Sequence, residues 1–234
     1  MHRTTKNCNK TRKTLFLFSV LWYTDTEAVI IMKYVFIIMI GYFLGCSNMA
    51  FYLAKIRNAD LRSGGSGNLG ASNAVVLLGW KAGVLTAVHD IGKAFLAVLL
   101  ARWLFPELEY AGAAAGVSCV LGHIFPFYLG FRGGKGFASY FGMTLALNWK
   151  LALVIAAAVI VVTIVTDYIV CGTLTTIITV PIYLGIHHSS LMLALILCIA
   201  TGVIAYKHRE NYPRMLNGTE LGLRSAIKGE NQIK

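Results

Sequence analysis

Residues 151–166 read LALVIAAAVIVVTIVT, an apolar run without a charged side chain. A second apolar run follows almost directly over residues 168–186. An α-helix needs about 20 mainly apolar residues to cross a bilayer, and both runs come close to that length. This part of the chain therefore predicts two adjacent membrane-spanning helices, and the same pattern recurs elsewhere in the sequence.

The whole chain has the composition of a membrane protein. Of its 234 residues, 57% are hydrophobic and 13% are charged, whereas a soluble domain carries about 25% charged residues. The apolar runs predict an all-α, polytopic integral membrane protein with about seven transmembrane helices. The fourth run is short, so we expect a tilted or half-buried helix there. The expected crossings are residues 33–54, 75–103, 111–130, 137–149, 151–166, 168–186 and 190–206.

The charge pattern gives an orientation. The formal charge of +11 comes from 21 basic and 10 acidic side chains, and the basic ones lie between apolar runs, which argues against a nucleic-acid partner. They concentrate in segments 55–73 and 131–136 and after residue 206, while segment 104–110 is acidic. Because cytoplasmic loops are enriched in Lys and Arg, seven crossings place the residue-33 end outside and the C-terminus in the cytoplasm.

Residues 1–31 form a doubtful N-terminal extension. Residues 1–13 carry five basic residues and no acidic one, which the predicted orientation would place on the wrong side of the membrane. A start of translation at Met32 would remove the conflict, and the alternative that the extension belongs to the protein stays open. The expected membrane domain covers residues 32–222, followed by a cytoplasmic tail over residues 223–234.

Three polar segments interrupt the apolar sequence. They are residues 64–73, 122–136 and 207–220, here called the first, second and third polar segments. All contain glycine with amide or hydroxyl side chains, and the second and third add Lys, Arg and His. Backbone amides of glycine-rich turns beside positive charges bind anions, and phosphate is the expected one. The predicted orientation puts all three on the cytoplasmic face, so together they indicate a phosphorylated substrate at the membrane surface.

Each polar segment also has a plainer interpretation. The first contains a G-x-G-x-x-G pattern, but no strand precedes it, so a dinucleotide-binding fold is rejected and a flexible interhelical turn is the alternative. The second lacks the P-loop spacing, so nucleotide hydrolysis is not supported. For His123, the alternative to substrate binding is a structural role at the end of a helix. In the third, the alternative for Lys207 is an interfacial anchor.

In this order, the three segments resemble the motifs of the bacterial membrane acyl-phosphate:glycerol-3-phosphate acyltransferase family. Those motifs are G-S-G-N-[IL]-G-[AG]-[ST]-N, G-H-x-F-P…F-[KR]-G-G-K-G and H-R-x-N…G-T-E, which match residues 65–73, 122–136 and 208–220. The Asp90-x-x-Lys93 pair is also similar to a family feature, and the resemblance covers about residues 32–222.

The resemblance implies an enzyme of phospholipid synthesis. It would move an acyl chain from acyl phosphate to the 1-hydroxyl of glycerol 3-phosphate, giving lysophosphatidate and phosphate. It implies no metal, no cofactor, and neither acyl-CoA nor acyl-carrier protein as donor. The protein would lie in the bacterial inner membrane among membrane lipid with its site facing the cytoplasm, and an acyl-phosphate-forming enzyme would supply the donor.

We expect Ser66, Lys135 and His208 to be the catalytic residues. Lys135 between glycines would hold a phosphate with the neighbouring amides, and His208 would hold the other phosphate or assist the hydroxyl proton. No residue stands out as a general base, so the substrate's own phosphate is an alternative proton acceptor. The expected substrate-binding residues are Gly67, Asn68, Ser72, Asn73, Lys93, His123, Gly133, Gly134, Gly136, Arg209, Asn211, Arg214, Gly218, Thr219 and Glu220.

The sequence departs from the family pattern at Val76, where the family usually has an Arg that can clamp a phosphate. Either another cation compensates, with Lys93 and Arg209 as candidates, or binding is weakened. Pro213 in the third polar segment is also unusual and is expected to kink the chain after the last crossing. Two other functions stay open: a transporter of a phosphorylated small molecule, and an inactive relative of the enzymes.

Overall fold

The structure is a computed structural model that describes residues 26–220 and 222–228. The predicted N-terminal extension lies outside the described residues up to residue 25, and so does the end of the predicted tail from residue 229.

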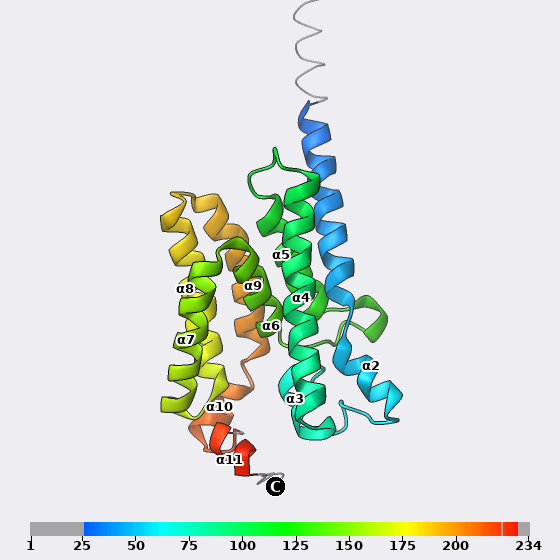
Figure 1. Cartoon of the computed structure of the whole chain (residues 1–234), viewed down its shortest axis with the longest axis vertical. Coiled ribbons are helices and arrows are strands. Elements are labelled where there is room, and N and C mark those ends of the chain that lie inside the picture. Colours follow the sequence, from blue (N-terminus) through cyan, green and yellow to red (C-terminus); the bar gives the residue numbers. More distant parts are fainter. Residues whose placement is uncertain (1–25, 221, 229–234) are drawn as a thin grey trace, which may run out of the picture. The chain divides into compact units, whose positions relative to one another are not determined.

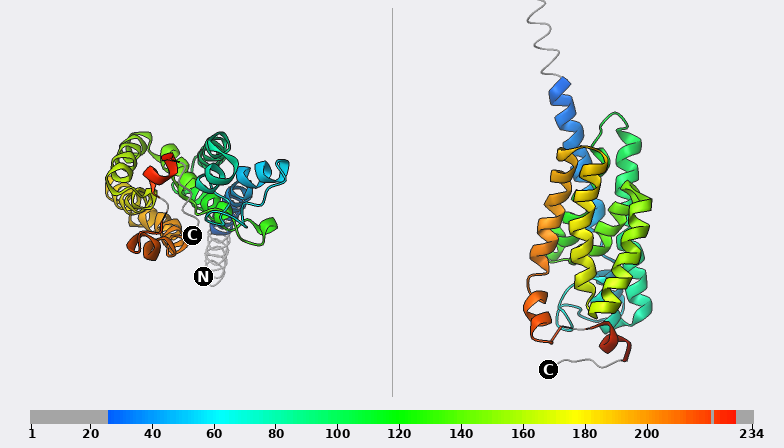
Figure 2. Two further views of the ribbon diagram at one scale, coloured as in Figure 1. Left: turned by 90° about the horizontal axis from the view of Figure 1, so that it is seen from below. Right: turned by 90° about the vertical axis from the view of Figure 1, so that its left-hand side faces the viewer.

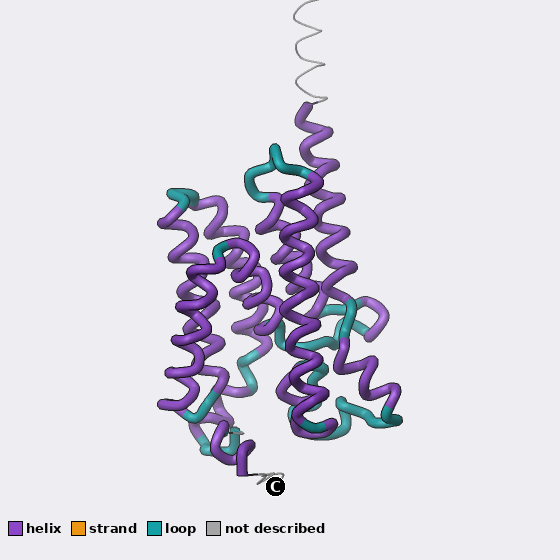
Figure 3. The backbone as a smooth tube through the Cα atoms, in the orientation of Figure 1, coloured by secondary structure: helices purple, strands orange, loops and turns teal. Residues whose placement is uncertain are grey.

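The chain divides into two compact units, residues 1–36 and residues 37–234. The described residues of the first unit are helical. In the second unit residues 37–46 are helical, and its described part contains further helices and no strand, which confirms the all-α class (Figures 1 and 3). These helices are α2 Met49–Ile56, α3 Ala71–Leu78, α4 Trp80–Leu104, α5 Ala111–Ile124, the 3-10 helix η1 Phe127–Leu129, α6 Phe137–Leu147, α7 Trp149–Thr166, α8 Ile169–His187, α9 Leu191–Lys207, α10 Asn211–Leu216 and α11 Leu223–Lys228.

All the predicted apolar runs are helical. Within the described residues, five helical stretches are long and apolar enough to cross a membrane, and α6 and α9 are shorter apolar helices of 11 and 17 residues. The full number of crossings and their direction stay predictions. The five long stretches are Thr26–Ile56, Trp80–Leu104, Ala111–Leu129, Trp149–Thr166 and Ile169–His187.

The third predicted crossing is interrupted between α5 and η1, and the first two contain breaks that hydrophobicity does not reveal. The first breaks after residue 46, and Asn48 begins α2 by accepting a hydrogen bond from Phe51 N at 2.9 Å. Asn48 Nδ2 also donates to Leu69 O at 3.0 Å, which fixes this break to the first polar segment. The second breaks at Gly79, whose φ of 86° suits a residue without a Cβ atom.

Small residues let the helices pack closely. A Cβ atom on Gly142 of α6 would lie 2.1 Å from Ile91 O of α4, so only glycine permits this approach. α4 packs against α5 and α6, and α7, α8 and α9 pack in chain order beside them (Figure 2). Apolar side chains of α7 are largely exposed, as expected for a helix surface in lipid; examples are Leu153, Val154, Val161 and Val165.

The two ends of the bundle in the second unit differ in character. α2, α3, α10 and α11 lie at the lower end in Figures 1 and 2, whereas the α4–α5 and α8–α9 turns lie at the upper end. The first polar segment leads into α3 and the third contains α10, so both lie at the lower end. The acidic segment 104–110 forms the α4–α5 turn at the opposite end, as the charge pattern predicts.

Candidate active site

One chain of hydrogen bonds joins the second and third polar segments. Lys135 Nζ donates to Asn211 Oδ1 at 2.5 Å, and Asn211 Nδ2 donates to Glu220 Oε1 at 2.5 Å. The other oxygen of this carboxylate, Glu220 Oε2, accepts from Arg214 Nε at 2.9 Å. The structure thus brings four predicted residues together in what is here called the Lys135 cluster. With two cations and one carboxylate, the cluster keeps positive charge for an anion.

His208 lies beside the Lys135 cluster at the end of α9. The residue is 5% exposed, and Asn211 N donates to its carbonyl oxygen at 2.9 Å. His208 Nδ1 lies 2.8 Å from Ile204 O. A carbonyl can only accept, so Nδ1 carries the hydrogen and Nε2 of the neutral ring is the acceptor. Burial lowers the pKa of His208; the bond to Ile204 opposes this, and the charge of Lys135 adds to the lowering.

Lys135 extends from a turn that is bonded to the end of α5. Gly133 N donates to Ile124 O at 3.0 Å, and Gly134 N donates to His123 O at 3.2 Å. In this structure both amides are bonded to the last carbonyls of α5, and their phosphate-binding role stays a prediction. Lys135 itself is half-buried, and burial lowers the pKa of its ammonium group while Glu220 raises it.

Gly136 differs from the two glycines before Lys135. It has a φ of 96° and is the N-cap of α6, whose first turn receives no side-chain cap. The N-terminus of a helix carries partial positive charge and unpaired amides, both of which favour an anion.

Ser139, in the first turn of α6, is a residue that the sequence analysis missed. It is 0% exposed, and its Oγ has no hydrogen-bond partner among the described residues. A buried hydroxyl without a partner is uncommon and indicates a place for a ligand or a water molecule. No helical spacing marks it in the sequence, because Lys135 lies in the turn before α6 and Ser139 inside the helix.

Asn73 organises the first polar segment. Its Oδ1 accepts from Ser66 N at 2.9 Å, and its Nδ2 donates to Leu61 O at 2.7 Å and Asn68 O at 2.9 Å. Asn73 is 2% exposed and holds the turn through these bonds, and its binding role stays a prediction. Asn68 stays a candidate ligand residue, because its buried Oδ1 has no partner among the described residues.

Arg62 ties the start of the first polar segment to the second. Its Nη2 donates to Leu129 O at 2.8 Å and to Arg132 O at 2.9 Å. Arg62 is one of the basic residues of segment 55–73, and no local pattern marks it further, because its partners lie 67 and 70 residues away. The predicted residues Ser66, Gly67 and Ser72 are exposed on the first polar segment.

Val76 lies at the same turn. A Cβ atom on Gly65 would be 3.7 Å from Val76 Cγ1, so the departure from the family pattern falls within the candidate site. Arg209, one of the proposed substitutes for the absent Arg, is exposed and engaged elsewhere. Its guanidinium lies 4.0 Å from the centre of the Tyr206 ring, and its Nη2 lies 3.5 Å from Glu210 Oε1.

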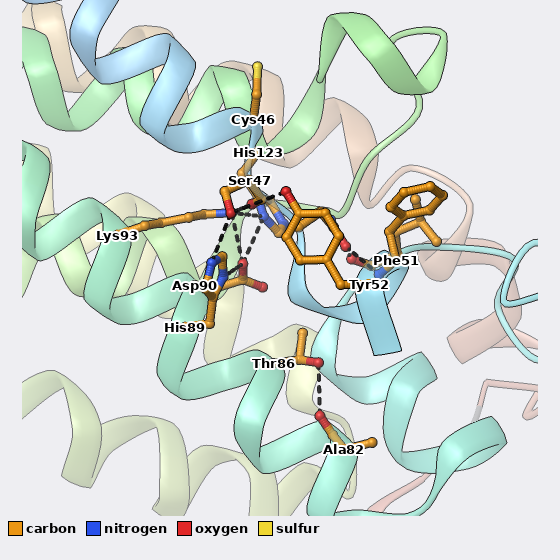
Figure 4. A network of polar contacts seen from close by, with 12 residues as sticks. Cys46, Ser47, Phe51, Tyr52, Ala82, Thr86, His89, Asp90, Lys93 and His123 are labelled. Atoms are coloured by element: carbon orange, nitrogen blue, oxygen red, sulfur yellow. Dashed lines mark hydrogen bonds and ion pairs between the residues drawn. The ribbon is translucent and has the colours of Figure 1, made fainter. Parts of the chain in front are cut away.

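Lys93 and His123 lie in a separate buried network (Figure 4). Lys93 Nζ is 2.8 Å from Asp90 Oδ1, donates to Ser47 O at 2.6 Å and lies 2.9 Å from His123 Nδ1. Lys93 and His123 are 6% and 3% exposed. These side chains are enclosed and the Lys93 charge is paired within the protein, so their binding roles stay predictions.

Gly218 and Thr219 shape the end of the third polar segment. Gly218 has a φ of 66°, and Thr219 N donates to Arg214 O at 2.8 Å, which turns the chain so that Glu220 reaches Arg214. Pro213 falls in the first turn of α10. An N–H group in the first turn has no partner within the helix, so a proline is tolerated there. Pro213 therefore lies in a new short helix after α9.

The bundle of apolar helices with a polar cluster at its end defines an integral membrane protein with a basic site. Within the described residues, no group of three or more His, Cys, Asp or Glu side chains could hold a metal ion.

Comparisons with known proteins identify the family. The model of the family described as glycerol-3-phosphate acyltransferase matches residues 35–218. The chain is 38% identical over 184 residues to a glycerol-3-phosphate acyltransferase of Brucella anthropi, covering 78% of this chain and 90% of the relative. It is 38% identical over 197 residues to one of Clostridioides difficile, covering 81% and 95%.

A solved structure agrees with these relatives. A crystal structure of PlsY, an integral membrane glycerol 3-phosphate acyltransferase, in its glycerol 3-phosphate form matches with a TM-score of 0.78 at 30% identity, covering 85% of this chain and 99% of that one. The lysophosphatidic acid form matches with a TM-score of 0.75 at 29% identity. The chain belongs to the glycerol-3-phosphate acyltransferase family.

Proposed function

We propose that this membrane acyltransferase moves an acyl chain from acyl phosphate to the 1-hydroxyl of glycerol 3-phosphate. The products are lysophosphatidate and inorganic phosphate. The observation that carries the proposal is the Lys135 cluster, in which Asn211 and Glu220 hold Lys135 and Arg214, and Asn211 N donates to the carbonyl of the buried His208. Together with the membership of the family, this cluster favours a substrate with phosphate groups.

One phosphate is held by Lys135, the N-terminus of α6 and the Ser139 hydroxyl. Lys135 supplies a positive charge, and the first turn of α6 supplies amides that receive no side-chain cap. The Ser139 hydroxyl is a buried donor that has no partner among the described residues. Preorganised donors of this kind stabilise charge that develops on a phosphate as it leaves. At the first polar segment, Ser66 and Asn68 orient the other substrate.

The chemical step needs little beyond correct positioning, because acyl phosphate is an activated donor. The 1-hydroxyl oxygen of glycerol 3-phosphate attacks the acyl carbonyl carbon. The bond from this carbon to the phosphate oxygen breaks, and phosphate leaves with the electron pair. The hydroxyl proton passes to the departing phosphate, and His208 Nε2 accepts a hydrogen bond from the hydroxyl before the attack.

The proposed location is the bacterial inner membrane, with the site at the cytoplasmic surface. Support comes from the basic segments near the lower end of the bundle and from the acidic turn at the opposite end. The acyl chain lies among the apolar helices, and an acyl-phosphate-forming enzyme supplies the donor.

The test uses the purified full chain in lipid nanodiscs and in liposomes. With acyl phosphate and glycerol 3-phosphate, we expect lysophosphatidate and phosphate in equal amounts, and no product from acyl-CoA or acyl-carrier protein. Product formed from acyl-CoA would overturn the assigned donor. Uptake of glycerol 3-phosphate into liposomes without product would identify a transporter, and neither uptake nor product would identify an inactive relative.

A further inference from the structure

A buried polar network lies between α4, α5 and the break before α2. Asp90 and Lys93 are one turn apart on α4, and Asp90 Oδ1 lies 2.8 Å from Lys93 Nζ and 3.3 Å from His123 Nδ1 (Figure 4). His89 closes it on the other side, with Nδ1 at 3.4 Å from Asp90 Oδ1 and Nε2 at 3.0 Å from Ser47 Oγ. The proposed reaction gives none of these groups a part in binding or proton transfer.

The opposite edge of the His123 ring lies against the turn that precedes Lys135. A Cβ atom on Gly134 would be 2.1 Å from His123 Nε2, and one on Gly133 would be 2.0 Å from His123 O. Gly134 N also donates to His123 O at 3.2 Å. Ring and carbonyl of His123 therefore contact the two glycines directly, and the next residue is Lys135.

We propose that His123 is a positioning residue for Lys135. The Asp90–Lys93 pair holds one edge of the imidazole, and the other edge holds Gly134 so that the Lys135 side chain reaches Asn211. The proposal rests on the proposed function, because it takes Lys135 as a phosphate ligand. His123 touches no substrate in this arrangement and acts only through the turn.

The geometry explains why both contacts are needed. Around Nδ1, His123 meets an ion pair that is almost fully buried, so the ring has little freedom to rotate. On the Nε2 side, the ring packs against the backbone of Gly134 so closely that a Cβ atom on this residue would overlap the ring. A displacement of the ring by a few tenths of an ångström is therefore transmitted to Lys135.

A double-mutant cycle tests this dependence. The variants are His123→Asn, which keeps a polar atom near Asp90 but withdraws from Gly134, then Lys135→Ala, and the pair. We expect His123→Asn to lower kcat/KM about tenfold, mainly through a higher KM. The affected substrate should be the same one whose KM rises in Lys135→Ala. In the Lys135→Ala background the same change should alter kcat/KM less than twofold. Equal effects in both backgrounds would overturn the proposal.

A second experiment tests the contact between His123 and Gly134 and does not depend on measurable activity of Lys135→Ala. Gly134→Ala should be strongly impaired, because its methyl group meets His123 Nε2. In the double variant Gly134→Ala with His123→Asn, that atom is absent, so we expect kcat/KM several-fold above that of Gly134→Ala alone. A double variant weaker than Gly134→Ala would contradict a contact between ring and turn.

The matched control is Ser118→Ala. Ser118 lies on α5 like His123, is buried, and donates from Oγ to Ala114 O at 2.6 Å within its own helix. We expect unchanged KM values, and thermal unfolding in detergent reports whether each variant is folded. Should Lys135→Ala itself have normal activity, the proposed function fails; should it be impaired while the cycle is additive, only the role of His123 fails.

Discussion

Lys135 in the second polar segment donates a hydrogen bond to Asn211 in the third, 76 residues further along the chain. The donor stands just before α6 and the acceptor begins α10, so the bond sets the relative position of two helix starts. Asn211 in turn contacts Glu220, and the cation is thereby held in place before any ligand arrives. Such preorganisation removes an ordering step from binding.

Lys135→Ala should lower kcat/KM by roughly 10- to 100-fold, the range expected when a hydrogen bond to a charged group is lost. The assay measures lysophosphatidate formed by the purified protein in nanodiscs. Lys150→Ala is the matched control, because Lys150 lies at the start of α7 beside the Trp149 ring and makes no contact with the Lys135 cluster among the described residues. Equal losses in both variants would contradict the assignment.

The pH dependence should show an acid limb that belongs to His208. Its pKa is lowered from 6.5, and the proposed role needs the neutral ring. Activity is therefore full above pH 6.5 and falls as the pH drops through the lowered pKa. The measurement is kcat/KM between pH 5 and pH 8. His208→Gln should abolish the limb; a limb that persists in this variant reports titration of the substrate phosphate, whose second pKa is about 6.

Ser139→Ala should separate activity from stability. The Ser139 hydroxyl is buried without a partner among the described residues, so its removal should leave the unfolding temperature equal or raise it. Loss of a phosphate ligand should nevertheless lower kcat/KM about tenfold. Thr144→Val is the control on the same helix, because Thr144 Oγ1 donates to Tyr140 O at 2.9 Å. It should lose stability and keep its KM values.

Val76→Arg should strengthen binding of a phosphorylated substrate. The side chain lies beside the Gly65 turn, where a guanidinium could form two charge-assisted hydrogen bonds with a phosphate. We expect the KM of one substrate to fall about tenfold, corresponding to one bond to a charged group. Val76→Gln adds length without charge and should leave KM unchanged. A similar gain in both variants would show that size, not charge, matters at this position.

The sequence predicted much of the fold and the grouping of the second and third polar segments. Runs such as residues 151–166 are helical because apolar composition leaves a chain in lipid no other way to satisfy its backbone. It did not predict the break at Asn48. That break depends on a hydrogen bond to Leu69, which no local hydrophobicity reports.

For the candidate site, the sequence predicted which residues gather there better than it predicted what each of them does. Asn73 and His123 were expected to touch substrate; in the structure both are buried and contact the turns of the polar segments. Conversely, Arg62 was overlooked because its two acceptors are backbone carbonyls, which carry no signature in the amino-acid sequence. Motifs identify the residues that gather at a site, whereas contacts within the protein show which of them also build its turns.

The shortness of α6 sets the depth of the site. Its 11 residues span about 16 Å at 1.5 Å per residue, roughly half of the 30 Å hydrocarbon layer. In the turn before α6, the amides of Gly133 and Gly134 are bonded to protein carbonyls at the end of α5 and need no water as partner. Under the proposed function, an acyl donor in the membrane would need to bring only its headgroup to Lys135 while its acyl chain stays among the lipid chains, so the lipid phase would serve as the donor supply.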